Sequence, residues 1–248
     1  MRAWLLLILW AVSAPTFAAS DYEREKRWDA EITPSIVVGD PVYLEQKNQH
    51  KFLGIYTGSP QAQMGVVVVH GTGIHPDWGM IGKLRQRLPD LGYTTLSIQM
   101  PVLAVDAKPE AYAALMPDAV ERIQLAVAFL KKKGYARIAL VSHSMGSRMS
   151  HAFMARNPTR VDAWVAIGMP AAFGSGAAIT YDGIKAPVLD LYGAHDLPQV
   201  LSGVDTRKAS LQRNPKSKQV MIPDTDHFFS DHEDAMIQAV KDFLDGVK

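Results

Sequence analysis

The chain has 248 residues, of which 48% are hydrophobic and 21% are charged, a composition that suits one sizeable globular core rather than two domains. Its 26 lysine and arginine residues nearly balance 25 acidic ones, so the charge does not indicate a nucleic-acid partner. The absence of cysteine excludes disulfide bonds and a thiol-linked lipid anchor.

The first 18 residues have the pattern of a secretory signal peptide. Arg2 provides a positive charge, and the apolar stretch at 3–10 is much shorter than the roughly 20 residues that span a bilayer. Small residues then lead to Ala18, after which we expect cleavage. Removing residues 1–18 would leave 25 basic and 25 acidic residues. We therefore expect a periplasmic or secreted protein without a stable membrane anchor, and the sequence indicates no particular oligomeric state.

Residues 19–34 are rich in charge and are expected to be a solvated leader segment, followed by a single domain at 35–248. This domain begins with antiparallel strands within 36–56, at the leading edge of a sheet. Further along, apolar runs alternate with helical patterns, which predicts an α/β fold with a mostly parallel sheet of about eight strands and helices on both faces. The apolar runs are 66–69, 94–98, 138–141, 164–167, 188–192 and 219–222.

The first strong strand, at 66–69, leads directly into His70-Gly71-Thr72-Gly73. In open parallel sheets, ligands and catalytic groups gather at the carboxyl ends of the strands. The two glycines allow a tight turn that brings a backbone N–H toward the site. Thr72 N–H is therefore expected to donate a hydrogen bond to an oxyanion. An ordinary glycine turn is the alternative.

Residues 141–146 are Val-Ser-His-Ser-Met-Gly, between an apolar run and a helical pattern. A sharp turn between strand and helix holds a serine hydroxyl above the sheet edge, so Ser144 is the candidate nucleophile and Met145 N–H the second oxyanion donor. The usual G-x-S-x-G pattern has glycine where this chain has Ser142, a small residue that the turn tolerates. His143 is expected to be a packed neighbour of the nucleophile. The alternative is an ordinary loop in which serine caps the helix.

Two later strand ends provide an acid and a base. The run at 188–192 leads to Asp196, which can accept a hydrogen bond from an imidazole N–H and stabilise its charged form. The run at 219–222 leads to His227, which lies before the last helix and can reach the serine as general base and acid. Capping of the next turn is the alternative role of Asp196, and His195 is attributed to loop structure.

Carboxylates and imidazoles around His227 raise the alternative of a metal site. Their spacing matches no metal motif, and Asp231 is explained by a capping box at 230–233 that opens the last helix. We therefore predict no metal and no other cofactor. The residues of this alternative are Asp224, Asp226, His227, Asp231 and His232.

Four elements in this order along the chain together resemble the α/β-hydrolase superfamily: the loop 70–73, the elbow 142–146, Asp196 and His227. Residues 73–78, Gly-Ile-His-Pro-Asp-Trp, and residues 97–101 are further similar to a family of uncharacterised bacterial proteins within that superfamily. The resemblance covers nearly the whole mature chain. It implies the fold but not the substrate, since one fold carries many reactions.

The predicted function is hydrolysis of carboxylic esters through an acyl-enzyme, with Ser144, His227 and Asp196 as the triad and a small-molecule ester or acyl compound as substrate. Thioesters and amides can be cleaved by the same parts. Residues 168–187 leave no room for a large cap domain, so an open site is expected. A catalytically inactive periplasmic binding or scaffold protein of the same fold is the alternative that Ser142 suggests. The apolar residues predicted to line the site are Met100, Leu103, Met169 and Phe173.

Overall fold

One eight-stranded sheet runs through the residues that the computed structural model describes, which are 20–157, 160–172 and 178–247. The predicted signal peptide lies outside these residues. The strand order along the sheet is β1-β2-β4-β3-β5-β6-β7-β8. The strands are β1 (Asp40–Glu45), β2 (Lys51–Thr57), β3 (Met64–Val69), β4 (Thr94–Ile98), β5 (Arg137–His143), β6 (Ala163–Ile167), β7 (Val188–Gly193) and β8 (Lys218–Ile222).

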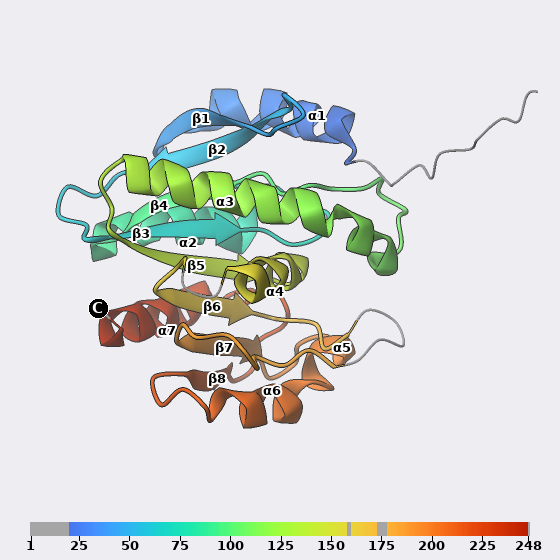
Figure 1. Cartoon of the computed structure of the whole chain (residues 1–248), viewed down its shortest axis with the longest axis vertical. Helices are drawn as coiled ribbons and strands as arrows, with labels where there is room; N and C mark the ends of the chain where they lie inside the picture. Colours follow the sequence, from blue (N-terminus) through green and yellow to red (C-terminus); the bar gives the residue numbers. More distant parts are fainter. Residues whose placement is uncertain (1–19, 158–159, 173–177, 248) are drawn as a thin grey trace, which may run out of the picture.

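The sheet is mostly parallel, as the apolar runs predict. All six runs form strands, β3 to β8, and every pairing among them is parallel. β1 pairs with β2 and β2 with β4 in the antiparallel sense, which confirms the predicted leading edge. The parallel strands point to the right in Figure 1, so the loops that follow their carboxyl ends lie together on that side.

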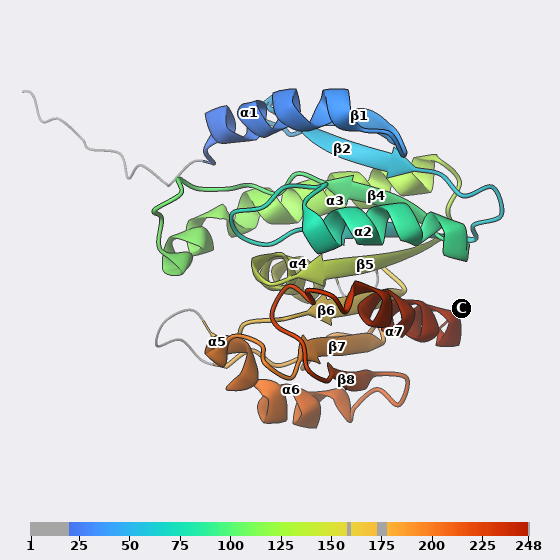
Figure 2. The same ribbon diagram turned by 180° about the vertical axis from the view of Figure 1, so that it is seen from behind.

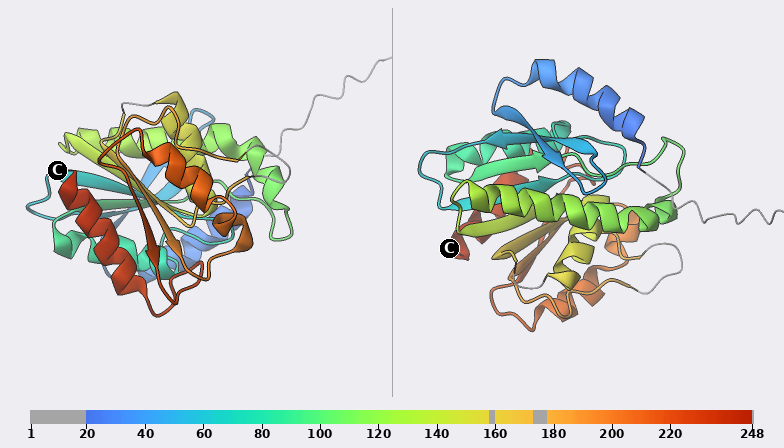
Figure 3. Two further views of the ribbon diagram at one scale, coloured as in Figure 1. Left: turned by 90° about the horizontal axis from the view of Figure 1, so that it is seen from below. Right: turned by 45° about the horizontal axis from the view of Figure 1, so that its top comes forward.

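Helices cover both faces of the sheet. α3 and α4 lie in front of it in Figure 1, whereas α2 and α7 lie on the opposite face, which Figure 2 brings forward. The left view of Figure 3 shows these two layers on opposite sides of the strands, each with its own apolar core. No helix in the described part of the chain is long and apolar enough to cross a membrane. The α-helices are α1 (Tyr22–Ile32), α2 (Gly79–Arg87), α3 (Met116–Lys132), α4 (Met145–Arg156), α5 (Pro198–Leu201), α6 (Val204–Leu211) and α7 (Glu233–Gly246).

The charged segment expected to be a solvated leader instead contains α1, which packs on the sheet. Ile32 joins Leu53 and Ile55 of β2 in a small apolar cluster. Glu25, only 5% exposed, accepts a hydrogen bond from the guanidinium of Arg122 in α3 at 3.0 Å. Charge density suggested solvation, but a glutamate that meets a buried arginine can be buried with it.

The last helix begins differently from the predicted capping box. α7 starts at Glu233, and His232, the residue before it, makes no capping hydrogen bond with its side chain. The hydroxyl of Ser230 donates instead to Asp226 at 3.1 Å. Asp226 therefore shapes the loop between β8 and α7, the loop that carries His227.

Candidate active site

Ser144 stands at a strained turn between β5 and α4. Its backbone has φ 55° and ψ −123°, a conformation that a residue with a side chain adopts only when its surroundings impose it. Close packing around the turn imposes it. A Cβ atom at Gly146 would lie 2.4 Å from the carbonyl oxygen of His70, so only glycine lets α4 begin this close to the end of β3. The geometry is that of a nucleophile elbow.

Three predicted residues from separate loops meet in one chain of hydrogen bonds. His227 Nε2 lies 2.9 Å from Ser144 Oγ, and His227 Nδ1 lies 2.6 Å from Asp196 Oδ1. Asp196 also accepts a hydrogen bond from Leu197 N–H at 2.7 Å, which orients its carboxylate. Gly168, at φ +54°, leaves room for the imidazole, because a Cβ atom there would lie 2.9 Å from His227 Cε1.

Ser142 has a structural partner that accounts for its place in the elbow. Its buried hydroxyl accepts a hydrogen bond from Trp164 Nε1 at 2.7 Å and donates one to the carbonyl oxygen of Val165 at 3.2 Å. Trp164 is fully buried in β6, where its indole N–H needs an acceptor. The serine in place of the usual glycine thus provides a hydrogen-bond acceptor for the buried indole of Trp164, behind the elbow.

The two predicted oxyanion donors border the same pocket as Ser144. Thr72 and Met145 both line that pocket. Met145 is the first residue of α4, where a backbone N–H has no acceptor within the helix. Gly71 lies directly against the elbow, since a Cβ atom there would be 2.9 Å from Ser144 Cβ.

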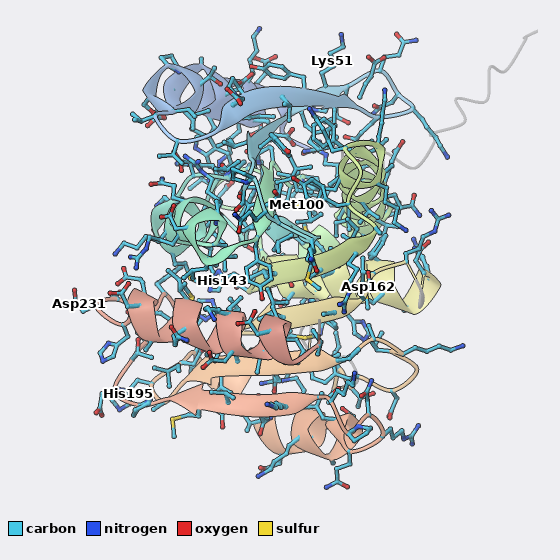
Figure 4. All side chains as sticks on the ribbon, turned by 90° about the vertical axis from the view of Figure 1, so that its left-hand side faces the viewer. Lys51, Met100, His143, Asp162, His195 and Asp231 are labelled. Atoms are coloured by element: carbon cyan, nitrogen blue, oxygen red, sulfur yellow. The ribbon has the colours of Figure 1, made fainter. Side chains whose placement is uncertain are left out.

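His143 is a packed neighbour of the site, as expected. Its Nε2 lies 2.9 Å from the backbone oxygen of His227, to which it donates, and the two imidazole centroids are 4.6 Å apart. Burial lowers the pKa of His143 to about 3, so the ring is neutral. Figure 4 labels His143 inside the fold, and His195 and Asp231, which are both exposed, toward its edge.

The pocket beside Ser144 has a volume of about 520 Å³. The predicted apolar walls Met100, Leu103 and Met169 lie in the core under α3 and α4 instead, and Phe173 is outside the described residues. Phe228 could have been predicted from the sequence, because it directly follows His227. No sequence pattern indicated the 3-10 helix Pro109–Leu115, which leads into α3. Residues that line the pocket and were not predicted include Pro109, Glu110, Ala171, Leu197, Gln199 and Phe228.

The acidic loop around His227 is held by hydrogen bonds within the protein. Asp226 accepts hydrogen bonds from the backbone N–H groups of Phe228 at 2.9 Å and Ser230 at 3.2 Å. Throughout the described residues, no group of three or more histidine, aspartate or glutamate side chains is arranged to hold a metal ion.

Comparison with known proteins points to one class of fold. Residues 13–120 match a family model described as a protein of unknown function, DUF3530. Comparison with curated proteins gives no match. Similar solved structures include Est1E from Butyrivibrio proteoclasticus, with a TM-score of 0.64 and 17% identity over 82% of this chain and 97% of that one.

Two further structures are similar over most of their length. Dienelactone hydrolase from Anabaena variabilis gives a TM-score of 0.68 and 19% identity over 82% of this chain and 97% of that one. A serine hydrolase without lid from Xanthomonas campestris gives a TM-score of 0.64 and 15% identity over 84% of this chain and 94% of that one. At these identities the likeness shows the fold alone, which is the α/β-hydrolase fold.

Proposed function

We propose that this chain, which has the α/β-hydrolase fold, is a serine hydrolase that cleaves carboxylic esters of small molecules through an acyl-enzyme. The observation that carries the proposal is the hydrogen-bonded chain from Asp196 through His227 to Ser144, with distances of 2.6 Å and 2.9 Å. Ser144, at the end of this series of hydrogen bonds, lines a pocket of about 520 Å³. A hydroxyl held by a base beside an open pocket is the arrangement that nucleophilic acyl transfer requires.

The proposed mechanism follows from this geometry. Ser144 Oγ attacks the ester carbonyl carbon while His227 Nε2 takes the hydroxyl proton, and Asp196 stabilises the imidazolium. The backbone N–H groups of Thr72 and Met145 donate to the oxyanion. His227 then gives its proton to the departing alkoxide. Water attacks the acyl-enzyme with the same histidine as base, which releases the acid and restores Ser144.

The pocket indicates which substrates fit this mechanism. Between β6 and β7, the described residues 168–172 and 178–187 contain no helix, so they build no helical cap over the site. The carboxylate of Glu110 is the only fixed charge among the pocket-lining residues that the structure describes, and Leu197 and Phe228 add apolar surface. We expect neutral or cationic esters and thioesters with an apolar part to be better substrates than anionic ones. The amino-terminal sequence supports a periplasmic or secreted location.

A catalytically inactive binding or scaffold protein with this fold is the other proposal that the sequence raised. This alternative was based on Ser142, whose hydroxyl accepts a hydrogen bond from Trp164 and so has a structural role. A binding protein has no need for a serine hydroxyl held 2.9 Å from a histidine that is itself paired with an aspartate. These observations favour the enzyme.

A fluorophosphonate probe tests the proposal directly. The purified protein should be labelled once, at Ser144, and Ser144→Ala should abolish both labelling and hydrolysis of a short-chain aryl ester. Ser202→Ala is the matched control, because Ser202 borders the same pocket without a hydrogen bond to His227, and it should keep the labelling. A well-folded wild-type protein that is neither labelled nor active would overturn the proposed function.

A further inference from the structure

His70 connects the oxyanion loop to the loop after β4. It is only 1% exposed, and both ring nitrogens have backbone partners. Nδ1 lies 2.8 Å from the carbonyl oxygen of Gly71, and Nε2 lies 2.8 Å from the backbone nitrogen of Met100. The proposed mechanism gives this histidine no role.

The two partners determine where the ring proton is. Met100 N–H can only donate, so Nε2 accepts and carries no proton. The proton of the neutral ring is therefore on Nδ1, which donates it to the Gly71 oxygen. Burial lowers the pKa of His70 to about 3, and the nearby positive charge of Arg122 acts in the same direction. The ring keeps this tautomer across the neutral pH range.

This hydrogen bond also determines where Thr72 N–H points. The described chain contains no cis peptide bond, and in a planar trans peptide the C=O and the following N–H point in opposite directions. Because His70 holds the Gly71 carbonyl oxygen, Thr72 N–H points away from His70. Thr72 lines the pocket, and Gly71 touches the elbow, so that direction is toward the place where the oxyanion forms.

The loop that holds the far side of the ring is itself anchored. Gln99 N–H donates to the Leu53 carbonyl oxygen at 2.8 Å, and Arg122 donates to the Gln99 carbonyl oxygen at 3.1 Å. Glu25 from α1 pairs with Arg122 at 3.0 Å. Met100 N–H therefore offers His70 a rigid donor, and a flip of the Gly71–Thr72 peptide would leave a buried imidazole N–H without an acceptor.

We infer that His70 is a positioning residue that holds the Gly71–Thr72 peptide with its N–H toward the oxyanion. The inference rests on the proposed serine hydrolase function. His70 acts on the rate of acyl transfer through Thr72 and does not touch the substrate. A flip of the peptide would replace a donor with a carbonyl oxygen, which repels the oxyanion.

Two amide substitutions separate positioning from packing. The amide of asparagine reaches the position of Nδ1, so His70→Asn can still donate to Gly71. The amide of glutamine reaches the position of Nε2, so His70→Gln can contact Met100 N–H but not Gly71. We expect kcat for a short-chain aryl ester to fall about 100-fold in His70→Gln and less than about 10-fold in His70→Asn, with KM changed less than about threefold.

Active sites are counted by fluorophosphonate labelling to completion, so kcat refers to folded and competent protein. His151→Gln is the control, because His151 also contacts a backbone oxygen, that of Thr180 at 3.0 Å, away from the oxyanion loop. It should keep kcat within about twofold of wild type, the range expected without any change in oxyanion stabilisation.

The outcomes are separable. Equal losses of kcat per active site in His70→Asn and His70→Gln, or no loss in either, would overturn the positioning role while the proposed function stands. A wild-type protein without labelling or ester hydrolysis would overturn both. A graded loss in kcat, largest in His70→Gln and with KM nearly constant, supports the inference, because a role in packing alone would alter the thermal midpoint and the number of active sites instead.

Discussion

Two buried carboxylates from one stretch of chain have different surroundings. Asp190, inside β7, receives hydrogen bonds from Arg207 Nε at 3.0 Å to both oxygens, from the Tyr181 hydroxyl at 2.7 Å and from Gln219 at 2.8 Å. We call these four residues the Asp190 cluster. Asp196, just beyond the same strand, has a backbone N–H and the imidazole of His227 as its closest partners.

The difference between these carboxylates is the kind of cation that each one faces. Arg207 carries a permanent positive charge, and both Arg207 and Asp190 are fully buried. The imidazole of His227 can gain and lose a proton, contacts Ser144 and itself lines the pocket. A buried carboxylate that faces a permanent cation contributes to the fold, whereas one that faces a titratable ring beside a pocket can serve catalysis.

Asp196→Asn should have the largest effect on activity. The amide cannot stabilise the imidazolium and favours the wrong tautomer of His227, so we expect kcat to fall about 10⁴-fold, or about 5 kcal/mol in transition-state stabilisation. Steady-state hydrolysis of an aryl ester measures this change. Urea unfolding should show a much smaller change in stability than in Asp190→Asn. A loss of kcat below tenfold would show that Asp196 is not the acid of the triad.

Asp190→Asn, the same chemical change at the other carboxylate, should act on stability. It leaves the buried guanidinium of Arg207 without a counter-charge, which should lower the free energy of unfolding by about 3–5 kcal/mol. Urea denaturation followed by circular dichroism measures this loss. In the folded fraction, kcat per labelled active site should stay within about twofold of wild type. If kcat fell while stability did not, the division between the two carboxylates would be wrong.

Acid should weaken the fold through two buried histidines, His70 and His143. Burial lowers the pKa of His70 and of His143 from 6.5 to about 3. As the pH falls below 6.5, the unfolded chain binds these protons and the folded chain does not, so stability is lost between those values. Together they should lower the free energy of unfolding by about 3 kcal/mol between pH 6.5 and pH 5.

Urea titrations at several pH values measure this dependence. His143→Gln should reduce the pH slope by up to one proton, since it removes one of the two titrating groups. His195→Gln is the matched control, because that imidazole is exposed, and it should leave the slope unchanged. An unaltered slope in His143→Gln would show that His143 is not kept neutral in the folded protein.

Ser142→Gly, which restores the usual elbow pattern, should have the smallest effect. It removes the acceptor of Trp164 Nε1–H, and Trp164 packs edge-on against Tyr181 of the Asp190 cluster. We expect a loss of about 1–3 kcal/mol in stability and kcat within about twofold of wild type, since a buried donor loses its partner. Thermal unfolding and ester hydrolysis test both. A large loss of activity would give Ser142 a role in catalysis that the contacts do not indicate.

Much of the fold follows from the sequence by local reasoning. The continuous apolar runs at 66–69 and 138–141 can only be buried on both faces, so a parallel sheet under two helix layers follows from them. Ser144, Asp196 and His227 each stand just after such a run, and the structure brings these three within hydrogen-bonding distance. The carboxyl ends of parallel strands lie along one edge of the sheet. Residues that directly follow a strand in the sequence could therefore be predicted to lie close together in the fold.

The tertiary structure alone decided which polar groups are buried together. Asp190 interrupts an apolar run in the sequence, and its partners come from a loop, from α6 and from β8. The packing of α1 against α3 and the place of Glu110 in the pocket likewise depend on elements far apart in the chain. Local patterns report how deeply an element is buried. They do not report the distances between elements, and those distances determine ion pairs and pocket walls.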